Sequence, residues 1–185
     1  MKNPKPYGLM CKSIVGIDPG GNGGIAIQAK GETRVVKMPK TIVEFSEIIK
    51  EVPEPFVFIE RVNKWRGDID TPGKHFGIDK MVANYNMVLN GLQILGVPYL
   101  EVHPRKWQSE FKTFLKDKTD RKQFYVQRAK ALYPDLKVFK WNADALLILY
   151  CGRVWTQWGY DWIYKTCTPF TKDKARWLWK TSVFM

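Results

Sequence analysis

The sequence predicts an α/β fold with a mixed five-stranded sheet flanked by helices. Five short runs of β-forming residues are separated or followed by helical patterns, and the first three runs come before any helix. The chain of 185 residues is 45% hydrophobic, which is enough for one domain with an ordinary buried core. We expect residues 1–154 to form this domain and residues 155–185 to form a Trp-rich C-terminal extension packed on it.

Strands are expected at five places, 13–18, 24–28, 34–38, 56–60 and 97–102. A turn rich in Gly and Asn separates the first two, which predicts a hairpin. The fourth run, from Phe56 to Ile59, is continuously apolar, and this pattern is typical of a strand that is covered on both faces. We therefore expect helices on both faces of the sheet.

Helices are expected over about 41–50, 78–95, 122–132 and 143–154, with a short helix after Pro104. Thr41 followed by Glu44 matches a capping box at the start of the first helix. Asn142 is placed to cap the last helix. The lysine-rich segment 112–122 is expected to be a loop.

Charge and cysteine content limit the kinds of protein that this chain can be. Thirty Lys and Arg residues against eighteen Asp and Glu give a net charge of +12, and such a field attracts polyanions such as nucleic acids. The three cysteines are far apart and form no metal-binding or disulfide pattern, which fits a reducing compartment. No uncharged stretch is apolar enough for a membrane span, and the N-terminus does not match a signal peptide. We therefore expect a cytoplasmic protein that binds nucleic acid.

Three carboxylates lie at the ends of apolar elements. Asp18 ends the first strand, Glu60 ends the fourth, and Asp144 begins the last helix. If the two strands are neighbours, their terminal acids lie side by side, and the helix can bring Asp144 to the same place. Such a cluster would bind hard cations such as Mg²⁺, and a pair of such ions can activate water for phosphodiester cleavage. Each acid also has a purely structural explanation, as a turn residue, a solvated strand end or a partner of the helix dipole.

Three motifs around these acids resemble those of a known nuclease family. Residues 16–20, 58–60 and 142–148 are similar, in order and spacing, to the three motifs of RuvC-type Holliday-junction resolvases. The resemblance extends over about 13–153 and is closest to the branch that contains phage RuvC-like proteins and chloroplast resolvases. Members of that branch share a Gly-rich loop and long helix after the glutamate, here from Pro72 onward, and a Pro-x-x-Trp element, here Pro104 to Trp107.

The resemblance implies an RNase H-like nuclease that uses Mg²⁺ or Mn²⁺, with two ions in each active site. Asp18 would bridge the two ions, Glu60 would bind one of them, and Asp144 would bind the other. Such an enzyme resolves Holliday junctions by paired nicks and takes part in DNA recombination and repair, with other branched DNA as a further substrate class. It would act in the cytoplasm, that of the host if a phage encodes it, and an organellar location stays open.

Family members carry a further active-site Asp or His three or four residues before the last carboxylate. This chain departs from that pattern, because Trp141 and Lys140 occupy those positions. Lys140 can place its ammonium against the scissile phosphate and offset the charge of the transition state, although it cannot bind a metal while protonated. The alternative is an ordinary solvated surface lysine. We therefore include Lys140 among the candidate catalytic residues.

Cationic segments around the site are expected to hold DNA mainly through its phosphates. The candidates are Lys64, Trp65, Arg66, Lys74, His75, Arg105, Lys106, Lys112, Lys116, Lys118, Arg121 and Lys122. Trp65 or His75 could wedge into the branch point, where the bases are already partly unstacked. For Trp65 the alternative is burial in the core.

The helix over 78–95 is expected to form the seam of a homodimer. Its apolar residues cover more than one stripe. We expect one stripe to face a partner and the other to face the sheet, the first containing Met81, Val82, Tyr85 and Leu89 and the second Val88, Leu92 and Leu95. The alternative is that both stripes are buried within one subunit.

Two other functions fit parts of the sequence. A noncatalytic protein of the same fold that binds branched DNA would explain Lys140 and Trp141 as the remains of a lost site. Residues 16–21 also resemble a phosphate loop of sugar kinases and actin-like ATPases, but those proteins need two such domains and 185 residues are too few. The first alternative therefore stays open.

Overall fold

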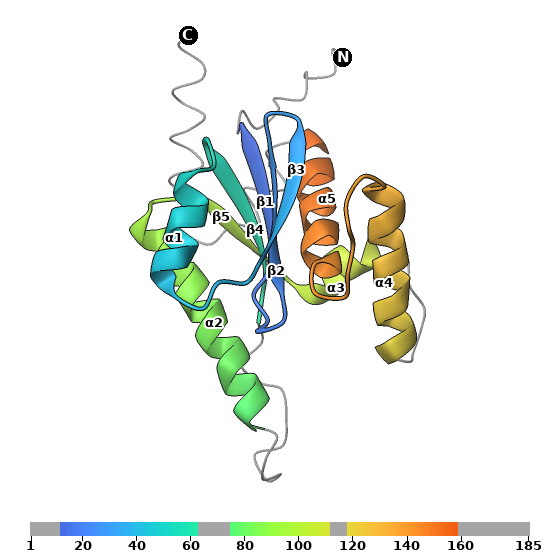
Figure 1. Ribbon diagram of the computed structural model, residues 1–185, viewed down its shortest axis with the longest axis horizontal. Coiled ribbons are helices and arrows are strands. Elements are labelled where there is room, and N and C mark those ends of the chain that lie inside the picture. The colour runs from blue at the N-terminus through green and yellow to red at the C-terminus, as the bar shows by residue number, and fades with distance from the viewer. Residues whose placement is uncertain (1–11, 63–74, 112–117, 159–185) are drawn as a thin grey trace, which may run out of the picture.

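The computed structural model describes residues 12–62, 75–111 and 118–158 (Figure 1). The strands within these ranges are β1 (Ser13–Asp18), β2 (Gly24–Ala29), β3 (Glu32–Lys37), β4 (Pro55–Glu60) and β5 (Tyr99–Val102). They form one sheet in the order β3-β2-β1-β4-β5. β2 is antiparallel to both β1 and β3, whereas β4 is parallel to both β1 and β5. The predicted mixed five-stranded sheet is confirmed.

Helices cover both faces of the sheet (Figure 1). The helices are α1 (Ile42–Lys50) and α2 (His75–Ile94) on one face, and α3 (Pro104–Ser109), α4 (Lys118–Leu132) and α5 (Ala143–Trp158) on the other. No helix in these described ranges is both long and apolar enough to span a membrane. The predicted α/β architecture with two helical layers is confirmed.

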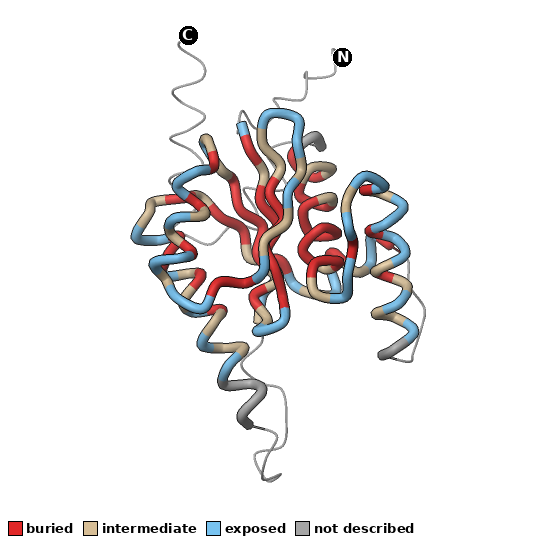
Figure 2. The backbone as a smooth tube through the Cα atoms, in the orientation of Figure 1, coloured by how far each residue is buried: buried red, intermediate tan, exposed pale blue. Residues whose placement is uncertain are grey.

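The core has two layers because successive strand residues point to opposite faces of a sheet. In β4, Val57 and Ile59 belong to the cluster under α1 and α2, whereas Phe56 and Phe58 belong to the cluster under α5. The buried positions follow the sheet and the inner side of α5 (Figure 2). β4 is thus covered on both faces, as its continuous apolar run predicts.

The start of α1 follows from its capping residues. Thr41 Oγ1 accepts a hydrogen bond from the Glu44 backbone N–H at 3.2 Å, and Glu44 Oε2 accepts one from the Lys40 N–H at 2.9 Å. The reciprocal bond of the capping box therefore goes to the residue before the cap. The predicted helix start is nevertheless confirmed.

The expectation of a loop up to Lys122 is wrong, because α4 begins at Lys118. Lys and Arg are good helix formers, and Asp120 in the first turn interacts favourably with the helix dipole. A high density of lysines is therefore compatible with a helix. As a result, Arg121 and Lys122 occupy fixed positions on α4.

The role expected for Asn142 is also wrong. Its Oδ1 accepts a hydrogen bond from the Phe139 N–H at 2.8 Å, and its Nδ2 donates one to the Lys137 carbonyl at 3.0 Å. The side chain is buried, and both of its polar atoms are hydrogen-bonded to the preceding turn. Asn142 therefore fixes the approach to α5 instead of capping its first amides.

The expected boundary at residue 154 falls inside α5, which continues to Trp158. Trp155 is buried in the core, with its ring centroid 6.0 Å from that of Phe58 and its Nε1 donating to Glu110 Oε1 at 3.2 Å. The residues from 159 onward lie outside the described ranges. The packing of the extension stays a prediction.

A glycine in the middle of β1 decides how closely α5 approaches the sheet. A Cβ atom at Gly16 would lie 2.4 Å from the Leu149 nitrogen and 2.5 Å from the Ala145 carbonyl oxygen, both of them backbone atoms of α5. Only glycine permits this separation. The helix therefore packs directly on β1, and this contact brings the first turn of α5 to the end of the strand.

Candidate active site

The strand register places two of the predicted acids on the same face and at the same edge of the sheet. β1 and β4 are parallel neighbours, and Ile17 is opposite Ile59. The next residues along the two strands are Asp18 and Glu60. Because side chains alternate, both carboxylates point to the α5 face, the same face as Gly16 and Phe58. The two strands that end in Asp18 and Glu60 are therefore neighbours, which is the condition for their acids to lie side by side.

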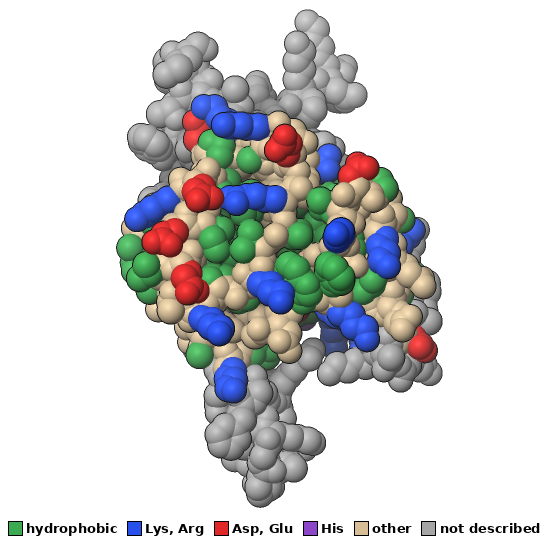
Figure 3. Space-filling model, viewed as in Figure 1, with side chains coloured by type: hydrophobic (Ala, Val, Ile, Leu, Met, Phe, Trp, Pro, Cys, Tyr) green, Lys and Arg blue, Asp and Glu red, His purple; other side chains and the backbone are tan. Residues whose placement is uncertain are grey.

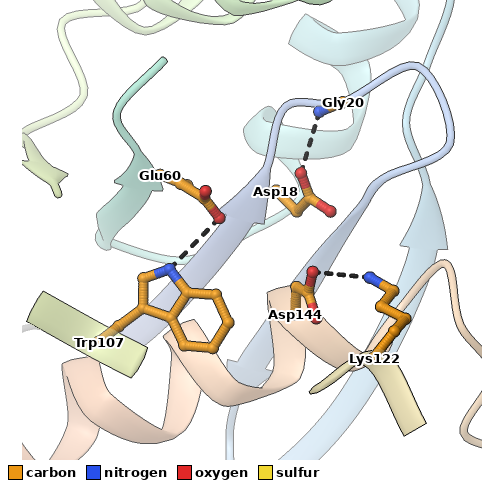
Figure 4. Close-up of polar contacts among 6 residues, drawn as sticks. All are labelled: Asp18, Gly20, Glu60, Trp107, Lys122 and Asp144. Carbon is orange, nitrogen blue, oxygen red and sulfur yellow. Dashed lines mark hydrogen bonds and ion pairs between the residues drawn. The ribbon is translucent and has the colours of Figure 1, made fainter. Parts of the chain in front are cut away.

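Asp144 reaches this edge from the first turn of α5, and the three carboxylates project into the same space (Figure 4). Within the described residues each carboxylate accepts one hydrogen bond. Asp18 Oδ1 accepts the Gly20 N–H at 3.1 Å, Glu60 Oε2 accepts Trp107 Nε1 at 3.3 Å, and Asp144 Oδ2 accepts Lys122 Nζ at 2.7 Å. Acids that are far apart in the sequence thus form one cluster.

Burial is the main influence on these acids. It raises the pKa of Asp18 to about 6, with a further contribution from the charge of Asp144. Burial and the charges of both aspartates raise the pKa of Glu60 to about 8. Burial also raises the pKa of Asp144, against the opposing effect of the Lys122 ammonium. Because the three half-buried acids repel one another, additional positive charge would stabilise the cluster.

The donor atoms fit a divalent cation. All three groups offer hard oxygen ligands, and Asp144 Oδ1 is buried with no hydrogen-bond partner among the described residues. In the described part of the chain, however, no three His, Cys, Asp or Glu side chains are arranged so that they could hold a metal ion. Metal binding would therefore require these side chains to rearrange.

The cation next to the cluster is Lys122 rather than Lys140. From the sequence Lys122 is a candidate for DNA binding only, because 22 residues separate it from Asp144 and no local pattern links them. Lys140 lines a cleft that Asp18 also lines, but it lies on the segment before α5. The position of Lys122 depends on the packing of α4 against α5, which no spacing rule reveals.

Trp107 is a second residue whose role the sequence did not show. The sequence identifies Trp107 only as part of the Pro-x-x-Trp element. Its side chain is 1% exposed and lies on α3, with its ring centroid 5.1 Å from that of Tyr125. Trp107 therefore holds Glu60 through an N–H group that is itself fixed by the core.

Four of the twelve predicted DNA-binding residues have described side chains. Arg105 and Lys106 are exposed on α3, beside Trp107, while Arg121 and Lys122 are half-buried on α4. His75 and Lys118 begin α2 and α4, but their side chains are outside the described part. The remaining candidates also fall outside it, namely Lys64, Trp65, Arg66, Lys74, Lys112 and Lys116. DNA contact by all twelve stays a prediction.

The expected division of α2 into two stripes is wrong for Tyr85. This residue is 5% exposed, belongs to the core cluster under α1 and α2, and donates its hydroxyl hydrogen to Glu101 Oε2. Val88 and Leu92 are buried, as expected for the stripe that faces the sheet. Met81 and Val82 are only half-buried, so these two remain available for contact with a partner.

A mixed five-stranded sheet of this order, flanked by helices on both faces, is typical of an RNase H-like fold. The structure is similar to Thermus thermophilus RuvC in complex with a Holliday junction substrate, with a TM-score of 0.51, 17% identity, and coverage of 78% of this chain and 97% of that chain. A second Thermus thermophilus RuvC structure has a TM-score of 0.49 and 18% identity over the same shares of the two chains. No protein-family model and no curated protein matches the sequence. The chain has a RuvC-like fold.

Proposed function

We propose that this protein is a structure-specific endodeoxyribonuclease that resolves four-way DNA junctions by paired, divalent-metal-dependent nicks. The main support is the meeting of Asp18, Glu60 and Asp144 at one edge of a RuvC-like sheet. The net charge of +12 favours a polyanionic substrate. The similar Thermus protein was solved with a Holliday junction bound. Forks and other branched DNA form a second proposed substrate class.

In this proposal Asp18, Glu60 and Asp144 would hold Mg²⁺ or Mn²⁺. The ions would supply an activated water and stabilisation of the leaving oxygen. Hydrolysis adds the water oxygen to phosphorus and breaks the bond to the 3′ oxygen, which takes up a proton and leaves a 5′-phosphate. Lys122 and Lys140 add positive charge near the reacting phosphate, where it is most effective in a partly dry site.

We also propose that α2 forms the dimer interface. The N-terminal half of this helix extends beyond the sheet (Figure 1), and it carries the half-buried Met81 and Val82. A two-fold dimer places two identical sites against opposed strands, which explains paired nicks. Light scattering on the full chain should give twice the monomer mass, and a strictly monomeric protein would contradict this arrangement.

The decisive experiment uses a synthetic four-way junction, a fork and a linear duplex, each with and without Mg²⁺. We expect symmetrical nicks in the junction only when Mg²⁺ is present. Asp18→Asn and Glu60→Gln should abolish cutting and leave junction affinity nearly unchanged or higher, because removal of a negative charge reduces repulsion of the phosphates. Cutting that persists in either variant would rule out the carboxylate assignment.

A noncatalytic protein that binds branched DNA is the second candidate. It is favoured by the Lys122–Asp144 ion pair and by the presence of Lys140 and Trp141 where family members carry an acid or histidine. In the same experiment such a protein would retard the junction in a gel and leave every strand intact with and without Mg²⁺.

A further inference from the structure

A cleft of about 790 Å³ opens beside the carboxylate cluster. It is bordered by the turn after β1 (residues 20–23), by the last residue of β3 with two residues beyond it (Lys37, Met38 and Lys40), and by the segment before α5 (139–141). Asp18 and Lys122 also line it, so the cleft is continuous with the candidate active site. Its volume lies within the range of roughly 300–1,000 Å³ that is usual for ligand sites.

The charge of the cleft favours an anionic ligand. Lys37, Lys40, Lys122 and Lys140 line it, and Asp18 is the single carboxylate among the described residues that line it. Lys37, Lys40 and Lys140 are exposed, and Figure 3 shows basic side chains beside exposed hydrophobic ones on this face of the molecule. Lysines spaced along an open cleft are suited to successive phosphates of a nucleic acid strand.

An aromatic pair forms one wall of the cleft. The rings of Phe139 and Trp141 are nearly parallel, with an interplanar angle of 12° and a centroid distance of 6.5 Å. Lys37 Nζ lies 5.9 Å from the Trp141 ring centroid. β2 makes room for the indole, because a Cβ at Gly24 would lie 3.0 Å from two of its ring atoms. Trp141 is therefore held between the sheet and Phe139.

Phe139 is 52% exposed, although phenylalanine is normally buried. Its flat ring borders a cleft that is otherwise rich in cations, and this combination matches the sites that bind single-stranded nucleic acid by base stacking. A paired base in a duplex has both faces covered by its neighbours. The exposed ring can therefore accept only a base that has left the stack.

We propose that this cleft binds an unpaired nucleotide next to the phosphodiester that the carboxylates receive. The base stacks on Phe139, and the exposed lysines hold the flanking phosphates. This inference rests on the proposed function, since it names the DNA feature that the site recognises. A branch point supplies such a nucleotide at low cost, because its bases are already partly unstacked. Trp141, which stands where family members carry an acid or histidine, thus has a binding role.

The test measures binding by fluorescence anisotropy with the full chain and no divalent ion, so that no DNA is cut. The two probes are a short oligothymidylate and a linear duplex. Phe139→Leu keeps the apolar bulk but removes the flat ring, and it should weaken binding of the oligothymidylate by at least about fivefold, the weaker end of base–aromatic stacking. Duplex binding should not change, and Phe139→Trp should restore the affinity.

Lysine variants test the electrostatic part of the cleft. Lys40→Ala should weaken binding of both probes and reduce the salt dependence, because one phosphate contact is lost. Lys50→Ala, at the exposed end of α1, is the matched control and should have a smaller effect. Equal losses in Lys40→Ala and Lys50→Ala would show that net charge alone acts, and would contradict a local phosphate contact.

The outcome for Phe139 separates this inference from the proposed function. If Phe139→Leu binds the oligothymidylate as tightly as the wild type, the stacking site is wrong, even if the wild type cuts junctions. If the wild type does not cut with Mg²⁺ but Phe139→Leu still loses single-strand affinity, the stacking site is supported and the nuclease proposal fails. Thermal melting verifies that the variants are folded.

Discussion

Lys122 Nζ lies 2.7 Å from Asp144 Oδ2, so a positive charge already occupies one side of the carboxylate cluster. The Lys122 side chain is 34% exposed and that of Asp144 is 17% exposed. The pair is therefore partly dry, and its interaction is stronger than that of a surface ion pair. The ammonium offsets the repulsion among three half-buried acids and occupies a carboxylate oxygen that a metal ion could use.

Lys122→Met should destabilise the metal-free protein at pH 8 by about 1–2 kcal/mol, between the values for exposed and fully buried pairs. The same variant should gain more thermal stability from Mn²⁺ than the wild type does, because the ion no longer competes with the ammonium. Melting curves with and without Mn²⁺ measure both effects. Lys130→Met, exposed on the same helix, should have neither effect. A smaller gain from Mn²⁺ in Lys122→Met would show that the lysine assists metal binding.

The pH dependence of stability follows from the raised pKa values. The pKa of Asp18 rises from 3.8 to about 6 and that of Glu60 from 4.5 to about 8, so the folded protein binds more protons than the unfolded chain between these limits. The contribution of these two acids to the free energy of unfolding is fully present below about pH 4. It is lost as the pH rises through the folded-state pKa values of about 6 and about 8. The metal-free protein should therefore melt at lower temperature at pH 8 than at pH 5.

Glu60→Gln isolates this effect, because glutamine keeps the shape without the charge. The melting temperature of the variant should exceed that of the wild type above pH 6, and the difference should grow toward pH 8. Glu47→Gln, on the exposed side of α1, serves as the control and should follow the wild type. A constant difference between Glu60→Gln and wild type from pH 5 to pH 8 would argue against a buried titrating glutamate.

Trp107→Phe should shift the pH at which junction cutting begins to higher values. The indole N–H donates to Glu60 Oε2 at 3.3 Å and lowers the pKa of Glu60 against the effect of burial. Loss of this bond should reduce cutting near pH 7 by about three- to tenfold and have less effect at pH 9. Trp155→Phe is a matched control, because it removes a similar bond, to Glu110 at 3.2 Å. An unchanged pH profile in Trp107→Phe would show that Trp107 does not influence cutting through the pKa of Glu60.

Gly16→Ala should push α5 away from β1 and displace Asp144. The added methyl group would meet backbone atoms that no side-chain rotation can move, and overpacking of this kind costs about 1–3 kcal/mol. We expect lower stability in urea and a loss of cutting that exceeds the loss of junction binding. Gly21→Ala adds the same group at 3.7 Å from its nearest neighbour and should leave stability unchanged. Normal cutting by Gly16→Ala would show that this close contact does not position the acid.

Elements with a strong local pattern could be predicted from the sequence. The capping pair Thr41 and Glu44 marks the start of α1, and the apolar run in β4 marks a strand covered on both faces. The candidate acids were recognisable for the same reason, since each follows or begins an apolar element. The pattern was misleading at Lys118 to Lys122, where charge density suggested a loop although the residues are good helix formers.

The sequence by itself determined the order of strands and helices and the positions of Asp18, Glu60 and Asp144 within them, because hydrophobic periodicity and turn residues are local signals. Only the tertiary structure decided which cation meets Asp144, that Trp107 holds Glu60, and that Phe139 and Trp141 line a cleft beside Asp18. These contacts join segments separated by many residues. Gly16 allows α5 to pack closely on β1. The positions of α3 and α4 against α5, however, are not encoded in any short stretch of sequence.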